Sequence, residues 1–89
     1  MSLICSILET TREGQVLAGT LTLGSDGQVT AEPSSPEYEF LMASILAETE
    51  ARVDGKWITV EQDPERWLRA LPSVFNGSYL RAGVEEKEG

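Results

Sequence analysis

The sequence predicts an α+β fold, with an antiparallel sheet of four to five short strands and two helices packed on one face, in the order β-β-β-α-β-α-β. Two observations lead to this prediction. Near the N-terminus, three segments with two-residue periodicity follow one another through tight turns, as antiparallel strands do. Further along, two segments open with the residues of a helix start and continue with apolar residues at helical spacing.

The first strand is expected over residues 2–11. Leu3, Cys5 and Ile7 alternate with mostly polar residues, which is the period of a strand with one buried face. A turn containing Gly14 follows, and its glycine can adopt the positive φ that a tight reversal needs. The chain is therefore expected to fold back on itself at this point.

The second strand is expected over residues 15–24, with Leu17, Leu21 and Leu23 on one face. Gly19 leaves a gap in this apolar row. A glycine inside a strand is typical of a bulge or of a close approach by another element. We therefore expect the first helix to approach the sheet at Gly19, or the strand to bulge there.

The strongest hairpin signal is Asp26-Gly27, which lies between two alternating segments and favours a tight reversal. A short third strand over residues 28–32 follows, with Val29 and Ala31 pointing inward. The next residue is a proline, which lacks the N–H needed for a sheet ladder, so the strand is expected to end there.

The first helix is expected over residues 35–51, ending near Arg52 or Val53, with Gly55 close enough to serve as its C-terminal cap. Ser35 is a suitable N-cap, and Pro36 occupies a position where a missing N–H has no cost. The apolar face follows the spacing i, i+3, i+4, i+7, i+8 and i+11 and comprises Tyr38, Leu41, Met42, Ile45, Leu46 and Thr49. Phe40 falls outside this face.

The second helix is expected to begin at Asp63 and Pro64, which repeat the pattern of a cap followed by proline, and to end at Leu71 before Pro72. A strand rich in β-branched and aromatic residues, over residues 56–60, precedes it. The helix is expected to bury Trp67, Leu68 and Leu71, and to pair Glu65 with Arg69 on its exposed side.

The last strand is expected over residues 78–84, where the side chains alternate. Residues 1–84 then form a single globular domain, because a chain of 89 residues has too little interior for two cores. Residues 85–89 have nothing to bury and are expected to be a frayed acidic tail.

Charge and cysteine content exclude several classes of protein. The net charge of −8 disfavours nucleic acid and anionic membrane surfaces as partners. A single cysteine, Cys5, excludes an intramolecular disulfide, so a reducing cytoplasm is the expected location. The sequence has no run of eighteen apolar residues and no basic region ahead of its first apolar residues, and we expect neither a membrane span nor export.

No residue combination predicts catalysis, a cofactor or a metal site. The sequence contains no histidine, which excludes Ser-His-Asp and Cys-His chemistry and the common zinc sites. Cys5 lies on the apolar side of a strand and is expected to be a buried, inert thiol. The carboxylates near the second helix, Asp63 and Glu65, are explained by capping. We therefore expect no catalytic residues.

One surface is a candidate for binding. In this acidic chain, three of the seven basic residues lie beside aromatic residues of the second helix and the last strand, and arginine next to aromatic rings is typical of interface anchors. The candidate site comprises Arg66, Trp67, Arg69, Tyr79 and Arg81. A simpler alternative stays open, in which Trp67 belongs to the core and the arginines balance nearby glutamates.

The sequence therefore favours a small, non-catalytic protein-interaction module that binds a protein partner or itself through this candidate site. The first alternative is a binder of a small anionic ligand at the arginines, and the weaker one is an enzyme that uses carboxylates alone. A homodimer and a monomer are equally compatible with the sequence. Self-association would use Phe40 or a sheet edge formed by residues 15–24 or 78–84, which carry few charges to block strand pairing.

Overall fold

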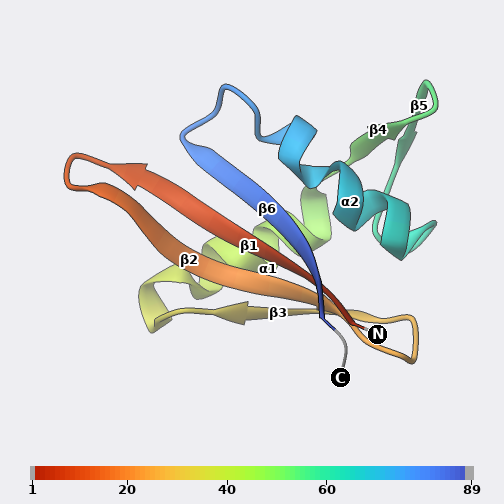
Figure 1. The fold of residues 1–89 in the computed structure, drawn as a ribbon, viewed down its shortest axis with the longest axis horizontal. Helices are drawn as coiled ribbons and strands as arrows, with labels where there is room; N and C mark the ends of the chain where they lie inside the picture. The colour runs from red at the N-terminus through yellow and green to blue at the C-terminus, as the bar shows by residue number, and fades with distance from the viewer. Residues whose placement is uncertain (1, 88–89) are drawn as a thin grey trace.

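The computed structural model of the chain describes residues 2–87 and has the predicted α+β architecture (Figure 1). A four-stranded antiparallel sheet has the order β3-β2-β1-β6. Its strands are β1 (Ser2–Thr11), β2 (Gly14–Leu23), β3 (Val29–Pro33) and β6 (Leu80–Lys87), and the helices are α1 (Glu39–Glu48) and α2 (Pro64–Val74). A separate hairpin consists of β4 (Ala51–Val53) and β5 (Lys56–Ile58).

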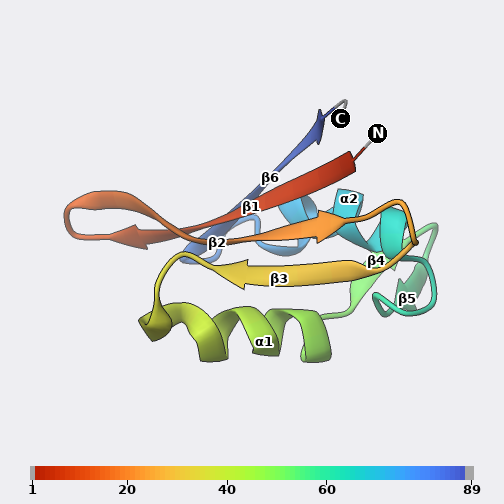
Figure 2. The ribbon, with the colours of Figure 1, turned by 90° about the horizontal axis from the view of Figure 1, so that it is seen from below.

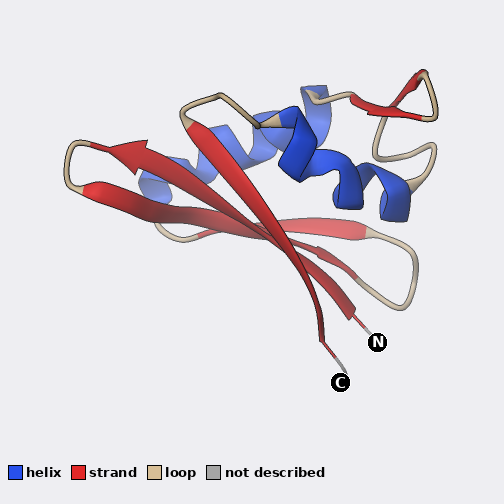
Figure 3. Cartoon of the chain, turned by 45° about the horizontal axis from the view of Figure 1, so that its top comes forward, coloured by secondary structure: helices blue, strands red, loops and turns tan. Residues whose placement is uncertain are grey.

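Both helices cover the same face of the four-stranded sheet, and the hairpin lies apart from it (Figure 3). Helix α1 runs alongside β3, while α2 lies near β6 and the hairpin (Figures 1 and 2). The core between these layers includes the predicted strand residues Leu3, Cys5, Ile7 and Leu21 and the predicted helix residues Met42, Ile45, Trp67, Leu68 and Leu71, all buried. Within residues 2–87, no helix lies on the opposite face of the sheet.

Strand β2 contains a bulge beside Gly19, as the sequence predicted. Ile7 pairs with Gly19 but Leu8 pairs with Leu17, so Ala18 is an extra residue in β2. Ala18 is buried, and the shift turns Leu17 to the opposite face, where it is 43% exposed. The expectation that Leu17 shares a face with Leu21 was therefore wrong, because an extra residue reverses the side-chain alternation.

Gly19 is also where α1 comes close to the sheet. A Cβ on Gly19 would lie 2.6 Å from the carbonyl oxygen of Glu32 and 2.9 Å from both Cγ and Sδ of Met42. These distances leave no room for a side chain. Both expectations for Gly19, a bulge and a close approach by the helix, are confirmed.

Helix α1 is shorter than the predicted 35–51. A single 3-10 turn, Pro36–Tyr38, precedes it, and the helix ends at Glu48. Phe40 lies off its packed face and is 84% exposed. The helix ends early because the chain beyond it forms the β4–β5 hairpin around Asp54 and Gly55, which both have positive φ. Asp-Gly is a hairpin signal that the sequence analysis took for a helix end.

Helix α2 begins as predicted and continues beyond its predicted end at Leu71. The Asp63 side chain accepts a hydrogen bond from the main-chain N–H of Arg66 at 3.2 Å. Pro72 lies inside the helix and does not stop it. The N–H of Phe75 donates to the carbonyl of Leu71 at 3.0 Å, so helical hydrogen bonding resumes after the proline.

Two expectations about the sheet need correction. Strand β6 extends to Lys87, and Lys87 pairs with Ser2, so residues 85–87 of the predicted frayed tail belong to the sheet. Residues 88–89 of that tail lie outside the described residues. Strand β2 lies between β1 and β3, so most of the segment 15–24 is not an edge, and the two edge strands are β3 and β6.

Candidate functional site

Of the five residues predicted as a binding site, Trp67 lies in the core. It is fully buried in α2, and its Nε1 donates a hydrogen bond to the main-chain oxygen of Thr49 at 2.9 Å. The indole thereby joins α2 to the segment between α1 and β4. Because the ring has no exposed surface, a partner cannot contact it while the core is intact.

Arg66 lies on the exposed side of α2 between two aspartates. Its Nη1 is 3.2 Å from Oδ2 of Asp54, in the hairpin, and its Nε is 3.6 Å from Oδ2 of Asp63, at the helix start. The side chains of Arg66 and Asp54 are largely exposed and that of Asp63 is partly exposed, so these pairs contribute little to stability. They do neutralise the charge that an anionic ligand would require.

Arg69 also pairs with two carboxylates. Its Nε lies 3.1 Å from Oε2 of Glu65, which is the predicted pair, and its Nη2 contacts Oε1 of Glu86 on β6. The hydrogen bonds that Arg69 donates to the carboxylates of Glu86 and Glu65 raise its pKa above the ordinary value. The arginine links α2 to the edge strand of the sheet.

Arg81 and Tyr79 lie at the other end of α2. The Nη1 of Arg81 donates to the main-chain oxygens of Phe75 and Ser78, in the connection before β6, and of Leu80, the first residue of β6. Tyr79 is 58% exposed. Arg66 and Arg69 line two different cavities of about 190 and 80 Å³, so the structure does not bring the predicted arginines together on one ligand-sized cavity.

A larger concavity lies between β3 and α1. It has a volume of about 620 Å³ and an open shape, and we call it, together with its continuation described next, the β3–α1 groove. Its wall on the sheet side is β3 itself, and its wall on the helix side is formed by Glu39, Met42, Ala43 and Leu46. The lining is mainly apolar, which is typical of sites that bury a ligand's or partner's side chains.

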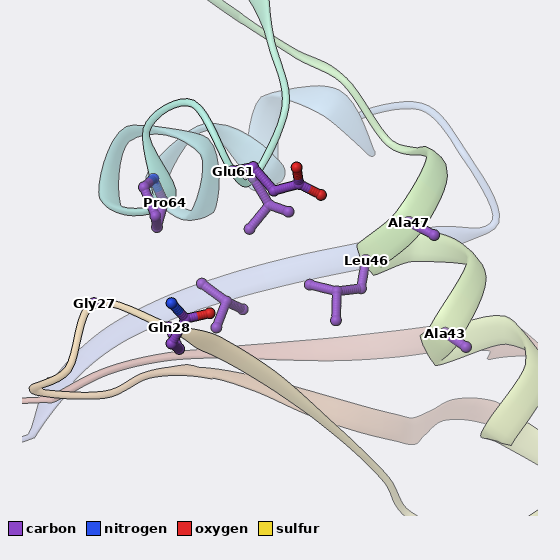
Figure 4. Close-up of a pocket in the computed structure, with 9 residues that line it drawn as sticks. Gly27, Gln28, Ala43, Leu46, Ala47, Glu61 and Pro64 are labelled. Carbon is purple, nitrogen blue, oxygen red and sulfur yellow. The ribbon is translucent and has the colours of Figure 1, made fainter.

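The groove continues beyond Val29, the first residue of β3, into a second cavity of about 490 Å³. The two share Val29, Ala43 and Leu46. In Figure 4, Ala43, Leu46 and Ala47 lie along helix α1 on one side of the cavity. Gly27 and Gln28, from the turn between β2 and β3, lie on the opposite side. Glu61 and Pro64 close the far end, and the Glu61 carboxylate extends toward the space above Leu46 (Figure 4).

The strand that borders the groove has unpaired main-chain groups. The hydrogen bonds from Gly24 to Gln28, at 2.9 Å, and from Ser34 to Ala18, at 2.9 Å, show that the even-numbered residues of this segment face β2. In an antiparallel ladder the alternate residues face the other way. The N–H and C=O groups of Val29 and Ala31 therefore point to the outer edge, beside the groove.

Small side chains leave space on the helix side of the groove. Ala43 and Ala47 are one turn apart, exposed, and both line it. Neither residue could be recognised from the sequence, because an exposed alanine on a helix has no distinctive pattern. Only the position of β3 at the sheet edge, with α1 directly beside it, gives these residues a role.

Three further features of residues 2–87 concern the cysteine, the possible metal ligands and the length of the helices. Burial raises the pKa of the Cys5 thiol to about 12, an effect partly offset by a main-chain hydrogen bond involving Gly83. Within residues 2–87, no three His, Cys, Asp or Glu side chains gather as metal ligands would. No helix in this range is long and apolar enough to cross a bilayer.

Comparison with models of known protein families, with curated proteins and with solved structures gives no match to this chain. The candidate site therefore depends on its geometry alone.

Proposed function

We propose that this protein is a non-catalytic protein-binding module that takes up an extended segment of a partner as an additional strand along β3, inside the β3–α1 groove. The observation that carries the proposal is the outer edge of β3, where the main-chain groups of Val29 and Ala31 face a groove lined by apolar side chains. Strand addition at an edge provides affinity through main-chain hydrogen bonds, and adjacent pockets provide specificity.

The lengths of β3 and α1, which form the two walls of the groove, match that of a short extended peptide. Strand β3 has five residues, a length of about 17 Å at the usual rise of a strand. Helix α1 has ten residues, a length of about 15 Å. A partner segment of about five residues would therefore contact both walls along its whole length. Alternate side chains of that segment would point into the groove, toward Ala43 and Ala47.

The end of β3 limits how far the pairing extends. Pro33 is the last residue of the strand and has no N–H, so it offers only its carbonyl on the outer edge. Proline at an edge is a common device against uncontrolled strand pairing. A defined, short partner segment fits this edge better than open-ended self-association does.

The predicted arginine surface has less support as a binding site. Arg66 and Arg69 are each paired with two carboxylates, and Trp67 is buried. A small anion would have to displace these carboxylates, at a cost in free energy that the β3–α1 groove does not impose. The proposal therefore keeps the predicted class, a protein-interaction module, and moves its site from α2 and β6 to β3 and α1.

The domain bounds, the cellular location and the oligomeric state are also part of the proposal. We propose that residues 1–84, with the extension of β6 to Lys87, act as one domain in a reducing cytoplasm, since Cys5 is buried and unpaired with another thiol. Of the two predicted routes to a homodimer through a sheet edge, only β6 remains, because β2 is internal. A dimer through β6 would leave the β3–α1 groove free.

Selection of binders from a random peptide library displayed on phage, followed by amide hydrogen exchange with the selected peptides, tests the proposal. A bound strand should protect the amides of Val29 and Ala31 by at least about tenfold, because they acquire hydrogen-bond acceptors. The amide of Thr30 already faces β2 and should change much less. Failure to select any peptide, or protection confined to α2 and β6, would refute the assignment.

Variants separate the groove from other surfaces. Ala31→Pro removes an outward N–H without removing a bond to β2, and Ala43→Tyr fills the groove from the helix side; both should weaken the selected peptides at least about tenfold. Phe40→Ala is the matched control on the same helix, because Phe40 is exposed and does not line the groove. The double variant Arg66→Ala, Arg69→Ala should also bind normally. If it alone loses binding, the originally predicted surface is the site.

A further inference from the structure

Most residues that line the β3–α1 groove come from a stretch of the chain that carries charge of one sign. From residue 13 to residue 51, which includes β2, β3 and α1, the sequence has seven acidic residues and no lysine or arginine. The basic residues lie elsewhere: Arg66 and Arg69, for example, pair with acidic residues of the hairpin, α2 and β6. Charge is therefore balanced around α2 and unbalanced around the groove.

The unbalanced carboxylates lie at defined places around the groove. Glu39 lines it near the start of α1, and Glu61 lines it at the opposite end. Glu32 lies on β3 and pairs with Thr20 of β2; its side chain is on the sheet face opposite the helices, because its neighbour Ala31 packs against the core and side chains alternate along a strand. All three side chains are exposed, and among residues 2–87 none of them forms an ion pair.

We infer that the partner segment is basic, with apolar residues alternating with lysine or arginine. This inference rests on the proposed strand addition. Successive side chains of an added strand point to opposite faces. One set would enter the groove against Met42, Ala43 and Leu46, and the other would lie beside Thr30 and Glu32, where opposite charges in neighbouring strands attract each other.

Charge also affects which partners are rejected. An acidic segment would place its carboxylates beside Glu32, close to Glu39 and Glu61 at the two ends of the groove and within the field of a chain of net charge −8. Like charges placed side by side discriminate against wrong partners and lower their rate of association. The groove therefore selects for positive charge and against negative charge in an otherwise similar apolar strand.

Three synthetic peptides test the inference: acetyl-Val-Lys-Val-Lys-Val-amide and its analogues with glutamine or glutamate in place of lysine. The lysine peptide should bind at least about tenfold more tightly than the glutamine peptide, and the glutamate peptide should be the weakest. Raising the salt concentration from low values to about 0.15 M should weaken only the lysine peptide by several-fold, because salt screens exposed charges.

Charge-neutral variants locate the effect. Glu32→Gln and Glu61→Gln should each weaken the lysine peptide by about two- to fivefold and leave the glutamine peptide unchanged, as expected for exposed ion pairs. Glu13→Gln is the matched control, because it removes the same charge in the turn between β1 and β2, outside the groove.

The outcomes distinguish this inference from the proposed function. If the glutamine or glutamate peptide binds as tightly as the lysine peptide and protects the amides of Val29 and Ala31, strand addition stands and the basic partner is refuted. If no peptide protects these amides, both fail. Concentration-dependent growth of large assemblies with protection at β3 would show that a second copy of this chain occupies the groove, and would also overturn the inference.

Discussion

The indole of Trp67 donates its N–H to the main-chain oxygen of Thr49 at 2.9 Å, and this contact joins the second helix to the chain between α1 and the hairpin. Replacing Trp67 with phenylalanine leaves this oxygen without its donor and opens a cavity in the core. We expect a loss of about 2–4 kcal/mol in the free energy of unfolding. Chemical denaturation measures it. Trp57→Phe is the control: Trp57 is 58% exposed, and its replacement should cost less than about 0.5 kcal/mol.

Gly19 gives a second stability prediction, because a methyl group there would overlap a main-chain oxygen of β3 and the side chain of Met42. Gly19→Ala should destabilise the fold by about 1–3 kcal/mol. In Gly83→Ala, the new methyl group meets nothing within 4 Å, and the variant should be as stable as the original or more so. Equal midpoints for the two variants in thermal unfolding would contradict the close approach of α1 to the sheet.

Cys5 should be unreactive in the folded protein. Its thiol is fully buried, and burial raises its pKa to about 12, so at pH 8 it is both inaccessible and protonated. A thiol reagent should modify it at least about 1,000-fold more slowly than a free cysteine, by way of unfolding. A new thiol at Ser6, on the open sheet face of a Cys5→Ala background, should react rapidly. Rapid modification of Cys5 itself would show that the sheet opens locally.

The hydrogen bond from Tyr38 to Glu9 should make stability depend on pH in alkaline solution. The phenol donates to the Glu9 carboxylate at 2.9 Å, and this contact raises the pKa of Tyr38 above its ordinary value of 10.0. Above pH 10 the unfolded chain therefore releases this proton more readily than the folded chain does. The stabilisation is complete below pH 10 and is lost as the pH rises through the higher, folded-state pKa.

Tyr38→Phe measures this contribution. The variant should be less stable than the original at neutral pH, and the difference should shrink as the pH rises above 10. Urea denaturation at a series of pH values gives the comparison. Glu9→Gln removes the negative charge and retains an acceptor, and should bring the pKa of Tyr38, measured by phenolate absorbance, closer to its ordinary value. A difference between Tyr38→Phe and the original that does not change with pH would contradict the linkage.

Much of the fold could be predicted because its local signals agree with one another. The alternation in β1 identified Leu3, Cys5 and Ile7 as core residues, and Gly19 was recognised from the missing side chain in β2. The hairpin at Asp26 and Gly27 also formed as expected: Gly27 has a φ of 81°, and the Asp26 side chain accepts from the N–H of Gln28. In each case the residue type is the one that the local structure requires.

The errors arose where two local interpretations compete. Asp54-Gly55 is suitable both for a helix end and for a hairpin, and the pairing of Ala51 with Ile58 decides in favour of the hairpin. Pro72 usually stops a helix, yet the chain after it returns to helical hydrogen bonding. Leu17 changed faces because of one extra residue, Ala18. Gly19 indicated a bulge in this part of β2, but not on which side of the glycine the extra residue lies.

The candidate groove could not be predicted because it depends on the order of the strands. Val29 and Ala31 were correctly placed on the inner face of the third strand, but their main-chain groups become available only because β3 is at an edge. Ala43 and Ala47 become relevant only because α1 lies beside that edge. Sequence periodicity shows which face of a helix or strand is buried, but it does not show which other element packs beside that helix or strand.

The pairing of Ser2 with Lys87 has a practical consequence for engineering. Cross-strand partners have Cα atoms about 5 Å apart, so a linker of a few residues is enough to join the first and last strands. New ends could then be opened at Gly55, in the hairpin outside the main sheet. Such a circular permutant retains every strand of the main sheet, and its new ends at Gly55 allow attachment to a surface through a residue that does not line the β3–α1 groove.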